Sequence, residues 1–350
     1  MSQLVAVSAM MPTDTHLPRP GQGTRLLFIV FVLLLSLGAA AQEWSVIPGL
    51  LFTEIALLLA PALLACRLHG IRPAVILGRR LAGREAWDPL LAGAGIGGLA
   101  FGMAVGLTVP LVLIFLFLGG HHPGLPLPLQ GGNDYAWALL SGAVVAPFCE
   151  EVFFRGFLLA SLRTHGAHLA VWVTAVCFGL FHMDPVRFLP TMALGVVFGE
   201  LTLATGSVLP AVAAHSVNNL VALSLAHLAG RAGGAQADMM SWESFRDEVA
   251  RQIGASGSLL AGWDPEAMAL LALVATSALC LLAGLTLAVL IWLCLNGLRR
   301  RLGGRWETML PGRPAGLLLR DPWLWGVLAV GLLVWGLQMV RLFGNPAAGG

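Results

Sequence analysis

The chain has 350 residues, of which 57% are hydrophobic and only 11% charged, with a formal net charge of +2 at pH 7. Soluble globular proteins carry about 25% charged residues, and the mean hydropathy here is +0.83. This composition excludes an ordinary soluble enzyme, a nucleic-acid-binding protein, a disordered protein and a disulfide scaffold. We expect an all-α fold, a polytopic helix bundle in a membrane.

Segments long and apolar enough to cross a membrane recur along the chain. A membrane-spanning helix needs roughly 20 mostly apolar residues, and about nine segments qualify. They lie at about 25–41, 47–66, 89–119, 135–160, 168–183, 187–204, 207–228, 266–296 and 322–342. The segment 89–119 exceeds one span and contains Pro110, so we expect it to be tilted, kinked or partly outside the membrane. The first segment also resembles a signal peptide, but its long apolar run favours an uncleaved anchor.

The polar stretches between these segments divide the chain. Residues 1–24 are expected to form a flexible cytoplasmic tail, 25–129 the N-terminal spans, 130–228 a central unit, 229–265 an extracytoplasmic polar loop and 266–350 the C-terminal spans. Within the loop, Trp242–Ile253 has the composition either of a short amphipathic helix on the membrane surface or of a solvated loop.

The arginines predict the orientation, because the chain has no lysine. Five arginines lie in 67–88 and six in 297–321, whereas 120–134 has none. Cytoplasmic loops are enriched in basic residues. With nine alternating spans and a cytoplasmic N-terminus, 15 of the 20 arginines lie on or near the cytoplasmic side. We therefore expect a multi-pass protein of a bacterial inner or plasma membrane with its N-terminus in the cytoplasm.

Ionisable side chains at membrane depth are costly, so each is a candidate functional residue. The first group is Glu150, Glu151 and Arg155. Glu151 and Arg155 are four residues apart and share a helix face, so they can pair. Glu150 points about 100° away from Glu151 and is left as an unpaired carboxylate, a candidate general base. The alternative is that all three residues form one buried ionic cluster that only fixes the helix packing.

Two further groups follow on later spans. Phe178 and His182 are four residues apart, as are His215 and Asn219. With a rise of about 1.5 Å per residue, Glu150 lies roughly 15 Å from the cytoplasmic end of its span. The same rise puts His182 roughly 20 Å, His215 roughly 12 Å and Asn219 roughly 18 Å from that side. The polar side chains lie at similar depth on three helices, which predicts one shared site. Histidines that serve only in packing would not be expected to gather at one depth.

The ordered set of motifs resembles the CPBP family of intramembrane proteases, which are related to the type II CAAX prenyl endopeptidase and to bacteriocin-processing proteins. The motifs are E-E-x-x-x-R (Glu150, Glu151, Arg155), F-x-x-x-H (Phe178, His182) and H-x-x-x-N (His215, Asn219). The resemblance covers roughly 130–228 and marks that unit as the catalytic core. It implies that Glu150 activates water together with His182, that His215 and Asn219 stabilise the oxyanion, and that Glu151, Arg155 and Phe178 support the site.

The expected activity is hydrolysis of a peptide bond in a membrane-associated or lipid-anchored protein or peptide, inside a cavity open to the cytoplasm. We expect no cofactor. Zinc is the alternative, because Glu150, His182 and His215 offer one carboxylate and two imidazoles. Two non-proteolytic functions also compete. A non-catalytic membrane immunity or scaffold protein would tolerate substitution of Glu150, and a proton-coupled transporter would show inverted repeats. The expected partners are the bilayer and a membrane-associated substrate, with no nucleic acid.

The arginine distribution makes a prediction about topology. A reporter fused after Arg84 or Arg305 should lie in the cytoplasm, and one inserted near Gly131 or Gly254 should lie outside. Accessibility of the reporters to an impermeant reagent measures this in whole cells. If the reporters at Arg84 and Gly131 lie on the same side of the membrane, the alternation of spans is wrong, and so are the depths derived from it.

Overall fold

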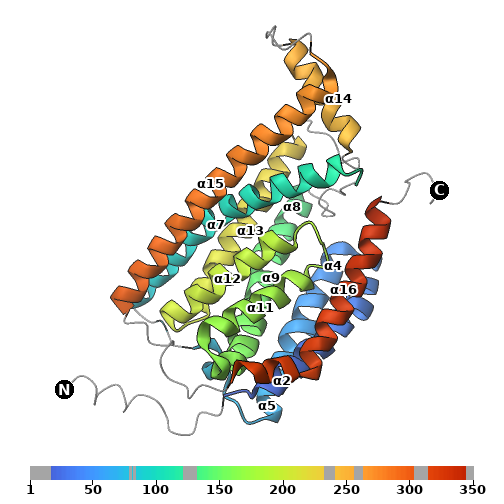
Figure 1. Cartoon of the computed structure of the whole chain (residues 1–350). Helices are drawn as coiled ribbons and strands as arrows, with labels where there is room; N and C mark the ends of the chain where they lie inside the picture. Colours follow the sequence, from blue (N-terminus) through green and yellow to red (C-terminus); the bar gives the residue numbers. More distant parts are fainter. Residues whose placement is uncertain are drawn as a thin grey trace.

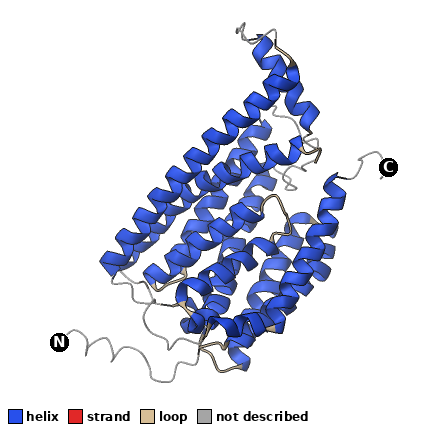
Figure 2. Cartoon of the chain, viewed as in Figure 1, coloured by secondary structure: helices blue, strands red, loops and turns tan. Residues whose placement is uncertain are grey.

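The computed structural model describes residues 17–78, 81, 84–120, 132–231, 241–255, 263–302 and 314–343. Within these ranges the chain is helical and contains no strand, and one isolated bridge joins Gly78 to Ser207 (Figure 2). The predicted all-α membrane bundle is confirmed.

Eight helical stretches in the described ranges are long and apolar enough to cross a membrane. The first two are interrupted by π-helical segments and comprise α2 (Pro20–Leu33) with α3 (Ala39–Trp44), and α4 (Val46–Phe52) with α5 (Ala60–Leu68). The fourth contains α8 (Gly132–Leu139), α9 (Ala146–Glu151) and α10 (Leu159–Leu162). The others are α7 (Arg84–Phe117), α12 (Phe188–Thr205), α13 (Leu209–Arg231), α15 (Pro265–Leu302) and α16 (Pro322–Phe343).

One of the nine predicted spans, the fifth along the chain, is a short helix. The segment predicted at 168–183 is α11 (Ala167–Phe181), an apolar helix of 15 residues. It ends before His182 because the following Met183 has a positive φ of 53° and Pro185 follows, which stops the helix. Eight of the nine predicted segments are thus long enough to span a membrane within the described residues, and the remaining one, α11, is an apolar helix of shorter length.

Other boundaries also differ. The helix α2 begins at Pro20, where proline suits a first helical turn, so the predicted tail is helical from Pro20 to Thr24, and residues 1–16 lie outside the described ranges. The segment 89–119 is one continuous helix with Pro89 and Pro110 inside it. Of the two alternatives for Trp242–Ile253, a helix or a loop, the structure has a helix, α14 (Trp242–Ala255).

The helices form two packed groups that meet at the motif helices (Figure 1). The long α7 packs against α15 and α13, α12 packs against α11, and α16 packs against α2. A large apolar core joins α2 and α5 to the segment 152–162 and α11 through residues such as Phe31, Phe153 and Phe157, all fully buried. The polar motif residues therefore lie where helices from distant parts of the sequence meet.

Glycines allow α7 to approach the helix that carries His215. Gly93 and Gly97 are one turn apart on α7, and a Cβ at either position would overlap the backbone of α13, at Pro210 or Ala214. Small residues permit this close backbone contact in membranes. Since Ala214 precedes His215, the contact helps to set the position of that histidine.

This contact yields a prediction with a matched control. Gly97→Ala should lower the stability of the purified protein by about 1–3 kcal/mol, because the new methyl group forces two backbones apart. Gly98→Ala should leave stability unchanged or slightly higher, because the added Cβ meets nothing within 4 Å and alanine favours the helix. Thermal unfolding in detergent compares the two variants. Equal melting temperatures would show that the contact does not constrain α13.

Candidate active site

A cavity of about 330 Å³ lies between the motif helices and the first two membrane segments. Glu150 of α9 and His182, which follows α11, both line it, together with Phe154, Phe178, Phe181 and Met183. The other lining residues come from the N-terminal helices and are Leu34, Gln42, Leu50, Thr53, Glu54 and Leu58. The structure therefore brings Glu150 and His182 to one cavity, whereas His215 and Asn219 are not among the residues that line it.

The two adjacent glutamates have different surroundings. Glu150 is half-buried at the cavity, and its Oε2 has no hydrogen-bond partner within the described part of the chain. Glu151 is fully buried, and its Oε1 accepts a hydrogen bond from Arg155 Nη1 at 3.0 Å. The expected pair between Glu151 and Arg155 is present, which leaves Glu150 as the carboxylate that faces the cavity.

Arg155 is fully buried and connects three helical segments. Its Nη2 donates to the Gly195 carbonyl of α12 at 3.1 Å. The guanidinium also lies over the ring of Phe178 on α11, 4.4 Å from the ring centroid. A buried cation needs such compensation, because desolvation otherwise outweighs its pairing energy.

His215 contacts Glu151 as well, which the sequence did not indicate. Its Nδ1 lies 3.0 Å from Glu151 Oε1, and its ring stacks on Phe198 with centroids 5.0 Å apart. A carboxylate only accepts, so Nδ1 donates. The ring nitrogen Nε2 is then the atom left for a substrate. Glu151 thus pairs with two residues, whereas the helical spacing pointed to Arg155 alone.

His182 is held by its own helix. Its Nδ1 donates to the Phe178 carbonyl at 2.9 Å, so in the neutral ring Nε2 is an acceptor. The Phe178 ring contacts both histidines, with centroids 4.9 Å from His182 and 5.8 Å from His215. Glu150 and His215 are both close enough to His182 to interact with it electrostatically.

Asn219 is positioned through a proline on the facing helix. A π-helical segment, Leu140–Val145, precedes Pro147, and the Ala146 N–H donates to Ser141 five residues back. With this five-residue spacing, the Gly142 carbonyl would accept a hydrogen bond from the N–H of residue 147, but that residue is proline and has no N–H. Asn219 Nδ2 donates to this carbonyl instead, at 2.8 Å. The amide keeps a second N–H for another acceptor.

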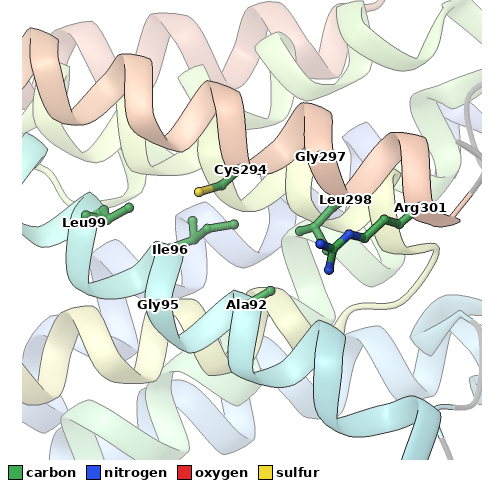
Figure 3. A pocket seen from close by; sticks show the side chains of 8 residues that line it. All are labelled: Ala92, Gly95, Ile96, Leu99, Cys294, Gly297, Leu298 and Arg301. Carbon is green, nitrogen blue, oxygen red and sulfur yellow. The ribbon is translucent and has the colours of Figure 1, made fainter.

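Two other features lie apart from this group. Glu200, an ionisable residue of α12, pairs with His168 and Arg299 and does not line the cavity. A larger hollow of about 570 Å³ lies between α7 and α15, with Arg301 at one end (Figure 3). It contains none of the motif residues, so the smaller cavity is the candidate site.

Glu54 is the residue of this cavity that the motifs missed. It is 6% exposed and lies in the π-helical segment Thr53–Leu59, between α4 and α5. The available signal was a carboxylate within an apolar span. No local pattern links it to Glu150, because the two residues meet only through tertiary packing.

The zinc alternative requires three ligands around one point. Among the described residues, no group of three His, Cys, Asp or Glu side chains could hold a metal ion. Glu150 and His182 line the cavity and His215 is not among its lining residues, so the three side chains considered for zinc are not gathered around one point in the described part of the chain.

The shared carboxylate generates a prediction. Glu151→Gln should leave Arg155 buried without a charged partner, at a cost on the order of 3–5 kcal/mol, so both membrane abundance and cleavage should fall. Replacing Glu151 with Gln and Arg155 with Met together should recover part of the abundance, because the uncompensated cation is gone. Cleavage should stay low, because His215 still lacks its carboxylate.

Immunoblotting of membranes and a cleavage assay on the same samples separate these effects. Wild-type abundance of Glu151→Gln would contradict the structural role of the pair.

Comparisons with known proteins agree with the motif assignment. Residues 132–221 match the family model described as type II CAAX prenyl endopeptidase Rce1-like. No curated protein and no solved structure matches the chain. The matched segment lies within the predicted core, 130–228, and contains every motif residue from Glu150 to Asn219. Residues 132–221 of this integral, multi-pass membrane protein are therefore similar to type II CAAX prenyl endopeptidases of the Rce1-like family.

Proposed function

We propose that the protein is an intramembrane endopeptidase that hydrolyses a peptide bond in a membrane-associated or lipid-anchored protein or peptide. The observation that carries this proposal is the cavity that Glu150 and His182 both line, where Glu150 Oε2 has no hydrogen-bond partner in the described ranges. The family match supports a CAAX-type protease in general terms.

Water activation follows from the two acceptors at the cavity. Glu150 offers a carboxylate oxygen, and His182 offers Nε2 because Nδ1 is engaged with Phe178. A water that donates one hydrogen to each acceptor directs its lone pairs toward a carbonyl carbon. Glu150 then takes the water proton as the oxygen attacks, and it returns that proton to the leaving amine when the C–N bond breaks.

The groups that stabilise the oxyanion come from the helix α13. His215 would donate from Nε2, which requires the doubly protonated ring, and Glu151 is the carboxylate placed to balance that charge. Asn219 would contribute the second N–H of its amide. Donors fixed in advance and shielded from water stabilise a developing oxyanion strongly.

The location explains the expected substrate class. A cavity within a membrane bundle is accessible to a chain that the bilayer already holds, by a lipid anchor or by its own apolar segment. We propose that the cavity opens to the cytoplasm, that the N-terminus is cytoplasmic, and that the membrane is a bacterial inner or plasma membrane, all from the distribution of arginines.

Three competing functions have distinct consequences. A zinc-dependent protease using Glu150, His182 and His215 would lose activity to a chelator and regain it with zinc. A non-catalytic immunity or scaffold protein would keep its phenotype after Glu150→Ala. A proton-coupled transporter would acidify or alkalinise the lumen of reconstituted vesicles in response to a substrate gradient.

Glu150 gives the direct prediction. Glu150→Gln keeps the shape of the side chain and removes its charge, so the protein should accumulate normally while cleavage falls by about 10²–10⁴, as for a lost general base. Comparative membrane proteomics of wild type against this variant should reveal an uncleaved precursor. The control is Glu43→Gln, since Glu43 is exposed and does not line the cavity. Near-wild-type cleavage by Glu150→Gln would remove Glu150 as the catalytic base.

A further inference from the structure

The part of the cavity wall that comes from the N-terminal helices contains an acidic side chain that the proposed reaction does not use. Glu54 lies outside the segment that matches the protease family, and it comes from the second membrane segment. It lines the same cavity as Glu150 and His182. The N-terminal helices therefore add a charged group to the space where a substrate would bind.

Glu54 is buried without compensation. Its side chain belongs to a residue only 6% exposed, and its Oε2 has no hydrogen-bond partner in the described part of the chain. No ion pair of Glu54 occurs within those ranges either, and the nearby acidic group, Glu150, interacts with it unfavourably. A buried carboxylate without a partner is costly, so the arrangement favours a ligand that brings the missing positive charge.

The rest of the cavity indicates what kind of cation fits. Its walls are mainly apolar, with Leu50, Leu58 and Phe181 around the two carboxylates. Electrostatic attraction is strong in such low-dielectric surroundings. A metal ion would need further ligands, and no group of three suitable side chains occurs among the described residues. A cationic group on a flexible apolar stem, as in a Lys or Arg side chain, matches both the charge and the apolar walls.

We propose that Glu54 forms a specificity subsite for a basic side chain of the substrate, next to the scissile bond. This inference rests on the proposed function, because it assigns the substrate class of the same cavity. Glu54 and Glu150 share the incoming charge, so the cation both binds the substrate and relieves the repulsion between the carboxylates. The aliphatic stem of the basic side chain packs against the leucines.

The test uses membrane-anchored peptides in which each position near the cleaved bond is either lysine or the uncharged norleucine. Binding of a cleavage-resistant form, with a reduced scissile amide, is measured to the full-length protein in lipid nanodiscs, and cleavage of the ordinary form is measured in parallel. At one position, the wild type should bind the lysine peptide about 10–100-fold more tightly than the norleucine peptide, a ratio expected for a charge-assisted contact. Glu54→Gln should bring this ratio of affinities close to one.

Glu43→Gln is the matched control and should keep the lysine preference, because it removes an exposed carboxylate outside the cavity. The inference is overturned if wild type shows no lysine preference in binding, or if Glu54→Gln retains it. It is also overturned if Glu54→Gln, at normal abundance, loses cleavage of both peptides equally, since Glu54 would then serve the hydrolysis itself. Lysine-selective binding without any cleavage would support the subsite and contradict the proposed protease function.

Discussion

One buried carboxylate oxygen, Glu151 Oε1, organises the candidate site. It accepts from Arg155 one turn along its own helix and from His215 on α13, both at 3.0 Å. Arg155 in turn donates to the Gly195 carbonyl of α12 and lies over Phe178 of α11. Since a buried charge is stable only while its partners stay in place, this one group constrains the relative positions of all the helices that carry motif residues.

Backbone chemistry supplies a second constraint on α13. Pro147 removes one hydrogen bond from its helix, and the carbonyl of Gly142 that is left over accepts from Asn219. On its other side, α13 contacts Gly93 and Gly97 of α7 backbone to backbone. His215 and Asn219 therefore lie on a helix fixed from two sides, which suits groups that must hold a developing charge without rearranging.

The site extends beyond the segment that matches the protease family. The match covers 132–221, whereas Gln42, Thr53 and Glu54 form part of the cavity wall from the first two membrane segments. The family segment contains the groups proposed for hydrolysis, and the N-terminal helices shape the space in front of them. Differences in substrate between proteins with the same motifs can then arise from helices outside the common core.

The amino-acid sequence by itself determined the membrane class, the helical segments and the pairing of Glu151 with Arg155, because hydropathy and i, i+4 spacing act within a single helix. It also indicated which residues share a depth. Tertiary structure alone decided that His215 contacts Glu151, 64 residues away, and that Glu54 lines the same cavity as Glu150. The rotation of each helix about its axis selects such long-range partners, and that rotation is set by packing against neighbours, including glycine contacts and π-helical turns, which no local pattern encodes.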